Sequence, residues 1–284
     1  MAIFTNQATL SYNGTSTNSN IAFGEILDVL TATKTSVENT YAIGDTVTYV
    51  VALRNTGNTA LTNITISDDL GGYEFGGTTV YPLNFVDGSV LYYVNGILQP
   101  TPTVTAGPPL SITGINIPAD SDAVIVYQAT VTNFANPDVD GSVTNTVTVS
   151  GDGINTPVTA SDTITSDSVA QLSISKTISP AQVVDNDRVT YTFIIQNTGN
   201  EAVVATSDAV ITDTFNPILT NLSVSYNGNA WTQGVNYNYD ETTGLFTTIP
   251  TNITVPAATF VQDVTTGEYI LTPGIATLTV EGTI

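Results

Sequence analysis

The amino-acid sequence predicts an all-β protein of two tandem immunoglobulin-like β-sandwiches with a further strand at the N-terminus. Thr, Val, Ile and Tyr alternate with polar residues in short stretches, and the turn signals Asn-Gly, Thr-Gly-Asn and Asp-Gly recur between those stretches. No segment keeps a helical period, and the second half of the chain repeats the first. A chain of 284 residues is long enough for two domains that each bury a core.

The internal repeat sets the predicted domain boundaries. The matched segments are 33–35 with 175–177, 44–49 with 186–191, 54–58 with 196–200, and 66–68 with 211–213. We therefore predict an N-terminal donor strand and linker at 1–24, an immunoglobulin-like domain one at 25–160 and an immunoglobulin-like domain two at 161–284. Alternate residues would form matched core rows in the two domains: Val47, Tyr49, Val51, Leu53 and Val189, Tyr191, Phe193, Ile195.

Domain two is expected to lack the last strand of domain one. In domain one the predicted strand at 123–131 is followed by another at 143–150, whereas the matching stretch at 277–284 is the last of the sequence. A sandwich that lacks a strand exposes a hydrophobic groove and unpaired backbone groups. Domain two is therefore expected to take a strand from elsewhere.

The first residues of the chain copy the strand that domain two lacks. Alternate residues from Phe4 to Tyr12 are predicted to share one face of a strand, with Asn6 among them. The strand at 143–150 carries Asn145 in the same apolar register. We predict that the N-terminal strand completes domain two of another copy of the protein, as in strand addition.

The spacing of the repeat favours a donor from another copy. Asn6 lies 28 residues before Lys34, and Asn145 lies 31 residues before Lys176, so a row of subunits would continue the order found within one chain. Insertion into domain two of the same chain is the alternative, disfavoured because the strand precedes domain one. Head-to-tail contacts that do not close build open filaments, so the expected partners are other copies in a head-to-tail homopolymer.

Composition narrows the possible functions. Lys and Arg total 4 against 25 Asp and Glu, a net charge of −21, which argues against a nucleic-acid partner. The sequence has no Cys and no His, which removes thiolate ligands, the commonest zinc ligand and the usual general base. No cofactor, no metal and no transmembrane segment are expected, and the first residues do not resemble a signal peptide. An enzyme acting on an external substrate is the least favoured class.

The two lysines of the chain occupy equivalent positions in the repeat. Lys34 and Lys176 each follow alternate apolar residues, so both ammonium groups are expected to point into a core. Asp68 and Asp213 lie in the apolar register of two other matched strands. Each domain would then bury one Lys, one Asp and one Asn: Lys34, Asp68 and Asn145 in domain one, and Lys176, Asp213 and Asn6 of the neighbouring subunit in domain two.

This combination of side chains predicts autocatalytic isopeptide formation. Desolvation favours a neutral amine and a protonated carboxyl group. A neutral lysine can attack the amide carbonyl of asparagine while the acid polarises it, and ammonia leaves. The competing interpretation is a buried Lys–Asp ion pair with Asn as a bystander, but it does not account for the shared context of both lysines. Glu281 is the second-ranked acid for domain two.

Taken in order, the motifs around Lys34, Asp68 and Asn145 and their second-half matches resemble a known family. They are Lys-Thr, Gly-Asp-Thr-Val-Thr-Tyr, Asn-Thr-Gly-Asn, Ile-Ser-Asp and Val-Thr-Asn-Thr-Val-Thr-Val. They resemble the conserved immunoglobulin-like repeat of Gram-positive and archaeal surface proteins, the class known as domain of unknown function eleven. The resemblance implies an extracellular structural role, and related adhesin and pilin domains carry Lys–Asn isopeptides with an acidic helper.

Together these observations predict a subunit of an extracellular filament, like a pilus or a spore appendage. It would assemble by donor-strand complementation, be locked by isopeptide bonds within and between subunits, and reach a cell or spore surface through an unknown anchor. The alternative is a monomeric surface adhesin that binds host protein or carbohydrate. For the carbohydrate version, Trp231 with Tyr226, Tyr237 and Tyr239 would supply a stacking surface, although core packing is the commoner role of such residues.

Overall fold

The computed structural model describes residues 2–26 and 28–284. Residue 1 of the predicted donor segment and residue 27 of predicted domain one lie outside the described residues. Strands make up most of the described chain, with a short 3-10 turn at Ala205–Ser207, so the predicted all-β fold is confirmed. Within these residues no helix is long and apolar enough to cross a membrane.

The chain divides into two compact units. Unit one comprises Met1–Asn39, Gly44–Thr132 and Val143–Ile164, and unit two comprises Thr40–Ile43, Asn133–Ser142 and Thr165–Ile284. Two short stretches of earlier sequence thus group with unit two.

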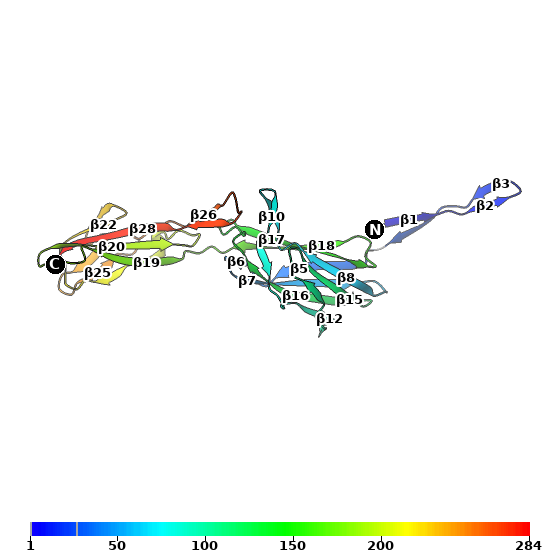
Figure 1. The fold of residues 1–284 in the computed structure, drawn as a ribbon, viewed down its shortest axis with the longest axis horizontal. Helices are drawn as coiled ribbons and strands as arrows, with labels where there is room; N and C mark the ends of the chain where they lie inside the picture. The colour runs from blue at the N-terminus through cyan, green and yellow to red at the C-terminus, as the bar shows by residue number, and fades with distance from the viewer. Residues whose placement is uncertain (1, 27) are drawn as a thin grey trace. The chain divides into compact units, whose positions relative to one another are not determined.

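The N-terminal residues 2–26, here called the arm, form a two-stranded antiparallel ribbon (Figure 1). Its strands are β1 (Ala2–Asn6), β2 (Thr9–Tyr12), β3 (Thr15–Asn18) and β4 (Ala22–Ile26). β1 pairs with β4 and β2 pairs with β3. The predicted single strand from Phe4 to Tyr12 is therefore wrong, because Gln7 and Ala8 interrupt it and the chain folds back after Tyr12.

The physical reason for the fold-back is the Asn13-Gly14 turn. Both residues have positive φ, 45° and 80°, which matches the two-residue turn that joins twisted antiparallel strands. Glycine adopts this conformation without steric cost, and Asn tolerates it better than most residues. The turn places Tyr12 directly opposite Thr15.

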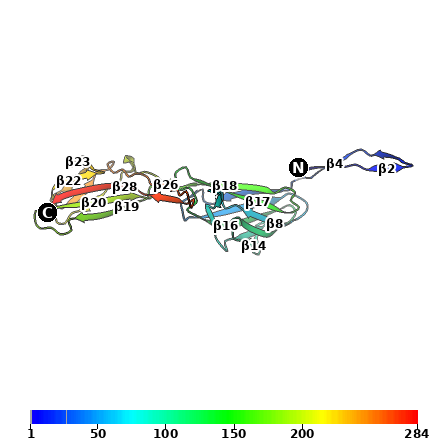
Figure 2. The ribbon, with the colours of Figure 1, turned by 45° about the horizontal axis from the view of Figure 1, so that its top comes forward.

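Unit one is a sandwich of two antiparallel sheets (Figure 2). The first sheet has the order β13-β12-β16-β7-β5, with β11 also pairing with β16. Its strands are β5 (Leu30–Ser36), β7 (Thr46–Asn55), β11 (Leu83–Phe85), β12 (Leu91–Val94), β13 (Ile97–Leu98) and β16 (Ser121–Val131). A separate small hairpin joins β9 (Tyr73–Phe75) and β10 (Thr78–Val80).

The second sheet of unit one has the order β14-β15-β8-β17-β18. Its strands are β8 (Leu61–Asp68), β14 (Thr103–Thr105), β15 (Leu110–Ile117), β17 (Ser142–Asp152) and β18 (Val158–Ser166). The last residues of β18 pair in parallel with β6 (Thr40–Tyr41), and these paired residues belong to unit two.

Alternation explains how these strands form a core. Every second residue of β7 is buried, as the sequence predicts for Val47, Tyr49, Val51 and Leu53, which are at most 1% exposed. The facing strand β8 buries Ile64, Ile66 and Asp68 in the same way. Burying β-branched and aromatic side chains at about 25 cal/mol per Å² is the main source of stability in such a sandwich.

The larger sheet of unit two has the same arrangement of strands as the first sheet of unit one. Its five-stranded sheet has the order β19-β20-β28-β22-β23, formed by β19 (Leu172–Ser179), β20 (Arg188–Asn197), β22 (Thr220–Tyr226), β23 (Asn229–Trp231) and β28 (Gly274–Thr283). Of the predicted core row, Val189, Phe193 and Ile195 are buried, and Tyr191 is half-buried.

The second sheet of unit two is much smaller. It contains β21 (Thr212–Thr214), β24 (Tyr237–Asp240) and β25 (Leu245–Thr248) in the order β21-β25-β24. A separate ribbon joins β26 (Thr259–Gln262) to β27 (Tyr269–Thr272). In the part of the chain that the structure describes, no strand pairs with the outer edge of β21. The equivalent edge of β8 in unit one is covered by β17 and then β18.

Candidate functional site

The first candidate site lies in the core of unit one, where Lys34 meets Asp68. Lys34 points inward from β5, the edge strand of the first sheet, and Asp68 ends β8 of the second sheet. The Lys34 Nζ atom lies 2.6 Å from Asp68 Oδ2, and the two side chains are 0% and 1% exposed. The predicted pairing of this lysine with this acid is therefore present in a dry environment.

Tyr127 connects this pair to Asn145. Its hydroxyl group donates to Asp68 Oδ2 and accepts a hydrogen bond of 3.3 Å from Asn145 Nδ2. Asn145 is fully buried on β17, as its apolar register predicts. The structure thus brings the three predicted residues of domain one into one network, with Asn145 reaching the carboxylate through Tyr127. We call Lys34, Asp68, Tyr127 and Asn145 the buried site.

Two polar atoms of this region lack partners. Tyr49 Oη and Asn145 Oδ1 are buried and have no hydrogen-bond partner among the described residues. The ring of Tyr49 lies under the amine, with Lys34 Nζ 4.8 Å from its centroid, and the Tyr127 ring is 5.8 Å away. A buried carbonyl oxygen without a donor is costly at rest, but it can accept a hydrogen bond when negative charge develops on it.

Burial shifts the protonation equilibria of these groups. Desolvation lowers the pKa of Lys34, and the charge of Asp68 opposes this effect less strongly. Burial also raises the pKa of Tyr127 well above its usual value, and Asp68 raises it further. Desolvation raises the pKa of Tyr49, while the neighbouring Asn145 side chain lowers it by less. Burial therefore shifts the Lys34 equilibrium toward the neutral amine and keeps the hydroxyl groups of Tyr127 and Tyr49 protonated.

Backbone contacts hold the Asp and Asn strands in register. Asp68 Oδ1 accepts a hydrogen bond of 2.8 Å from the Leu70 N–H group, which fixes the carboxylate. Asp69 Oδ1 accepts one of 2.9 Å from the Thr146 N–H group, next to Asn145. Because Asp68 also pairs with Val147 across the strands, the amide side chain is held beside the acid without a flexible loop.

The second candidate site is its counterpart in unit two. Lys176 lies on β19, and its Nζ atom forms an ion pair with Asp213 Oδ2 on β21. Three aromatic rings surround the amine, with centroids 4.5 to 5.3 Å from Nζ: Tyr191, Phe215 and Phe193. The Lys176 side chain is 37% exposed and that of Asp213 is 19% exposed. We call Lys176 and Asp213 the open site.

The two lysines have the same register but different cover. Lys34 lies opposite Val51 on β7, and Lys176 lies opposite Phe193, the matching residue of β20. The prediction that Lys176 is buried is wrong for the single chain, because the described residues of unit two include no counterpart of β17 and β18 over β19.

One residue of the buried site is replaced in the open site. Tyr127 pairs with Tyr49 across β16 and β7, and in the same place Val280 pairs with Tyr191 across β28 and β20. The open site thus keeps the tyrosine under the amine and loses the tyrosine that bridges acid and amide.

The second-ranked acid of domain two has a different partner. Glu281 accepts a hydrogen bond of 2.6 Å from Arg188 Nε, and this neighbour lowers its pKa. Asp213 is the carboxylate that contacts Lys176 in the structure.

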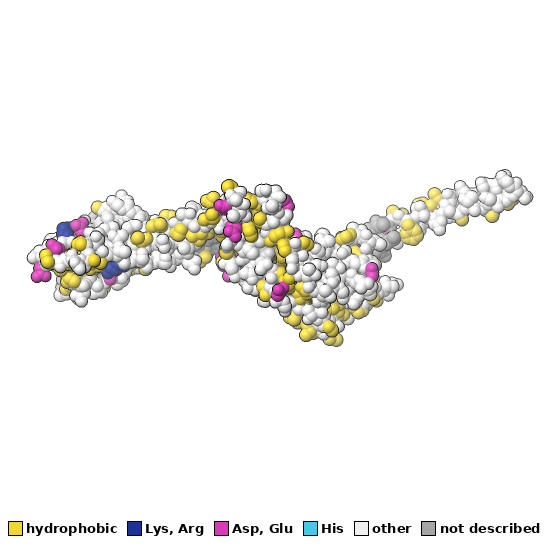
Figure 3. All heavy atoms as spheres, in the orientation of Figure 1, with side chains coloured by type: hydrophobic (Ala, Val, Ile, Leu, Met, Phe, Trp, Pro, Cys, Tyr) yellow, Lys and Arg dark blue, Asp and Glu magenta, His cyan; other side chains and the backbone are white. Residues whose placement is uncertain are grey.

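Asn6 is on β1 of the arm, and its side chain is exposed. Ala22 lies opposite it on β4. Described residues 3–23 of the arm are all exposed, and apolar side chains are visible along it in Figure 3. Ile3, Phe4, Leu10 and Phe23 are between 55% and 75% exposed. Such a ribbon is marginal in water without a surface to pack on.

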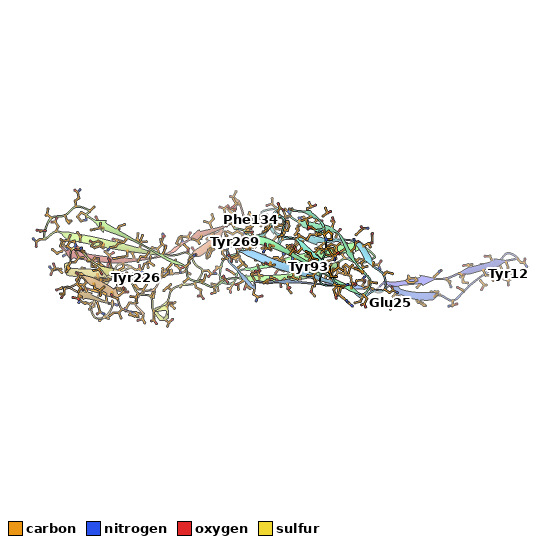
Figure 4. The ribbon with its side chains drawn as sticks, turned by 90° about the horizontal axis from the view of Figure 1, so that it is seen from below. Tyr12, Glu25, Tyr93, Phe134, Tyr226 and Tyr269 are labelled. Atoms are coloured by element: carbon orange, nitrogen blue, oxygen red, sulfur yellow. The ribbon has the colours of Figure 1, made fainter. Side chains whose placement is uncertain are left out.

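The aromatic residues considered for carbohydrate stacking pack within unit two. Tyr226, Tyr237 and Tyr239 are at most 7% exposed. Trp231 stacks on the Tyr226 ring at a centroid distance of 4.8 Å, and the Tyr226 hydroxyl bonds to Thr254. The position of Tyr226 is labelled in Figure 4. These residues therefore stabilise the core.

Sequence comparison identifies no relative. No family model matches the sequence, and the search of curated proteins found no match.

Comparison of structures finds distant likenesses to pilins. The full-length major pilin SpaD of Corynebacterium diphtheriae is 14% identical with a TM-score of 0.37, over 60% of this chain and 47% of SpaD. The pilus backbone protein RrgB of Streptococcus pneumoniae is 15% identical with a TM-score of 0.35, over 86% and 55% of the two chains. The major pilin subunit BcpA of Bacillus cereus is 10% identical with a TM-score of 0.37, over 87% and 64%. The chain thus spans less than two thirds of each pilin, and the likeness carries no functional argument.

Proposed function

We propose that this protein is a structural subunit of an extracellular filament that assembles head to tail by donor-strand complementation. One observation carries the proposal. Lys34 is buried in unit one under a strand that bears Asn145, whereas Lys176, at the equivalent position of unit two, is partly exposed to solvent. The arm repeats the pattern of that strand, with Asn6 in place of Asn145. Docking of one subunit's arm on the next subunit's unit two covers both exposed surfaces at once.

The contacts of the buried site support the proposal that an isopeptide bond forms there. The neutral amine of Lys34 attacks Cγ of Asn145, and the unpartnered Tyr49 hydroxyl donates to Oδ1 as negative charge develops there. Asp68 holds the proton that the Lys34 ammonium gave up, passes it through Tyr127 to the departing Nδ2, and takes up the second proton that the attacking nitrogen loses. The C–Nδ2 bond breaks, one ammonia leaves, and an amide links Lys34 to Asn145. The protein acts only once, on itself.

The open site would perform the same reaction between subunits. Docking of the arm removes water from Lys176 and Asp213 and brings Asn6 of the neighbour to the amine. Tyr191 stands where Tyr49 stands in unit one. Because Val280 replaces Tyr127, Asp213 would donate the proton directly to the departing nitrogen of Asn6.

The setting proposed for this filament is a cell or spore surface. The order of its motifs resembles the immunoglobulin-like repeat of surface proteins, and the anchor that would attach it is unknown. A structural fibre needs neither His nor Cys, and the sequence contains neither. If the subunit is monomeric, a surface adhesin is the function that remains.

Denaturing electrophoresis of the assembled protein tests the proposal. A ladder that survives heat and detergent is expected, and Asn6→Ala or Lys176→Ala should abolish it. The matched control is Asn145→Ala, which removes the equivalent amide in unit one and should leave the ladder intact. A single monomer band from a chain that keeps Asn6 and Lys176 would rule out the covalent bond between subunits. Monomers in native gel filtration as well would rule out the filament.

A further inference from the structure

We infer that the donor is a two-stranded hairpin: β1 and β2 take the place of β17, and β3 and β4 take the place of β18. The inference rests on the proposed function and adds a second docking surface, the exposed side of β19. A single donor strand would pair with β21 and bring Asn6 to Lys176. The second leg of the hairpin would then close the sandwich against β19.

Unit one shows what the second strand does. β17 and β18 are neighbours in one sheet, and Asp162 of β18 contacts Ser36 of β5 in the other sheet. Asp162 Oδ2 on β18 accepts hydrogen bonds of 2.9 Å from the Ser36 N–H group and 2.5 Å from its Oγ–H group. With this cover, Leu30 is 5% and Lys34 is 4% exposed.

In unit two, β19 is the counterpart of β5, and no described strand of this unit covers it as β18 covers β5. Leu172, Ile174 and Ile178 share the register of Lys176 on β19 and are 44%, 56% and 41% exposed. Leu172 is the counterpart of Leu30, since each lies opposite the Asn that ends the neighbouring strand. An exposed apolar row on an edge strand is an aggregation hazard unless a partner covers it.

The arm has the form of the missing pair. Its two legs run antiparallel from base to tip, and Glu25 and Tyr12 mark these two ends in Figure 4. The first leg spans residues 2–12, and β17 has 11 residues. A hairpin with this pairing delivers both strands in one docking event.

Side chains on the second leg match the surface that they would meet. The side-chain contact between Thr144 and Thr163 and the hydrogen bond from the Ser166 N–H group to the Gly141 carbonyl oxygen indicate a register in which Asn145 lies opposite Asp162. In the arm, Ala22 lies opposite Asn6. Equivalent docking therefore replaces Asp162 by Ala22 and the facing Ser36 by Ile178. A polar pair inside unit one becomes an apolar pair between subunits, so each surface suits its own partner.

A second pair shows compensation in volume. Val143 on β17 and Ile164 on β18 are both buried, and the register indicated by the Thr144–Thr163 contact sets them opposite each other. Their counterparts in the arm are Phe4 and Gly24, which pair across β1 and β4. A Cβ atom on Gly24 would overlap the Phe4 ring, so glycine leaves the space that the larger ring occupies. The arm is therefore built as a pair of strands with an inner face.

Cysteine cross-linking tests the hairpin donor, because the natural sequence has no Cys. Two variants, Ala22→Cys and Ile178→Cys, are each made in an Asn6→Ala background, mixed, assembled and oxidised. The expected result is a disulfide-linked dimer on a non-reducing gel that collapses with reductant. The control replaces Ala22→Cys by Phe23→Cys, the next residue, which lies on the other face of β4 and should not cross-link.

The outcomes separate the two proposals. Filaments that form without the Ala22–Ile178 cross-link, or that cross-link equally through position 23, would overturn the hairpin donor and leave the filament standing. Failure of the unsubstituted chain to assemble would overturn both. If only the Asn6→Ala background fails to assemble, the same cysteine variants are made with Asn6 present. The expected loss of free thiols on oxidation of those filaments then decides the question.

Discussion

Tyr127 is the residue that distinguishes the buried site from a simple ion pair. Lys34 and Asp68 alone would be a buried salt bridge, which contributes little net stability. The Tyr127 hydroxyl contacts both the Asp68 carboxylate and the Asn145 nitrogen that would leave as ammonia in the proposed isopeptide reaction. Its raised pKa keeps it protonated, so it can donate a proton to nitrogen and recover one from Asp68 without becoming a phenolate.

Tyr127→Phe should slow isopeptide formation in unit one. A general acid–base group contributes roughly 10²-fold or more to a reaction rate. We therefore expect ammonia release after refolding to slow by about that factor, and intact-mass measurements over time would follow it. The loss of a buried hydrogen bond should cost about 1 kcal/mol in stability. Tyr92→Phe removes another bonded hydroxyl, on β12, and should not change the rate. Equal rates in the two variants would remove Tyr127 from the mechanism.

Asn145→Ala should leave unit one without the proposed cross-link. The Asn145→Ala chain should then have the mass calculated from its sequence. The parent chain should be one ammonia lighter than the mass calculated from its own sequence. A link that closes a loop of about 110 residues stabilises by roughly 4.7 kcal/mol in the chain-entropy view, so Tm should fall by on the order of 10 °C. The control Thr144→Ala alters the exposed neighbour on β17. If the parent chain shows no loss of ammonia relative to its calculated mass, as in Asn145→Ala, then no bond forms in the parent.

At the scale of elements, the arm depends on close packing between its own two legs. The ring of Phe4 lies over Gly24, and both belong to the face that carries Asn6 and Ala22. Exposed two-stranded ribbons are marginal, so a single clash in this face should open the pairing of β1 with β4.

Gly24→Val should therefore weaken assembly while leaving unit one intact. The Cβ of valine would displace the Phe4 ring, and we expect a critical assembly concentration at least about tenfold higher, equivalent to about 1.4 kcal/mol per contact. Sedimentation measures the assembled fraction. Glu25→Ala, on the other face of β4, serves as the control. Assembly of Gly24→Val at the parental concentration would contradict a role for this face.

Periodicity was sufficient to predict most of the buried site, and it failed where packing partners decide the outcome. The alternation around Lys34, Asp68 and Asn145 fixes their direction, so their meeting was predictable from register. Tyr127 was missed because it reads as one more core aromatic; the usable signal is that a buried tyrosine hydroxyl needs a partner. The exposure of Lys176 could not follow from its own strand, because cover comes from strands elsewhere. The hairpin was available in Asn13-Gly14, a strong turn signal that a single-strand interpretation overlooked.

At the scale of the whole molecule, the net negative charge makes subunits repel one another and so opposes the proposed assembly. The net charge is −21, yet residues 2–26 contain one charged residue, Glu25. An almost neutral arm can approach an acidic neighbour at little electrostatic cost, while the bodies of the subunits repel.

Salt should therefore accelerate filament growth without changing the product. Raising ionic strength from about 10 mM to 150 mM shortens the screening length from roughly 30 Å to 8 Å, and we expect the light-scattering half-time of assembly to fall several-fold. A neutral osmolyte at equal osmolality is the control for non-specific effects. Slower assembly in salt would mean that attraction between opposite charges, rather than burial of the arm, drives docking.

The proposed donor-strand assembly predicts a filament with a direction that can be measured. A subunit without residues 2–26 keeps the open site of unit two and can accept an arm, but it has none to donate. Mixed with the full chain, it should end growth wherever it is added, so mean filament length by electron microscopy should fall as its fraction rises. A full-length Lys176→Ala subunit still accepts and donates an arm, so it should shorten the heat-stable ladder without shortening native filaments. If arm-less subunits leave filament length unchanged, the arm is not the element that joins one subunit to the next.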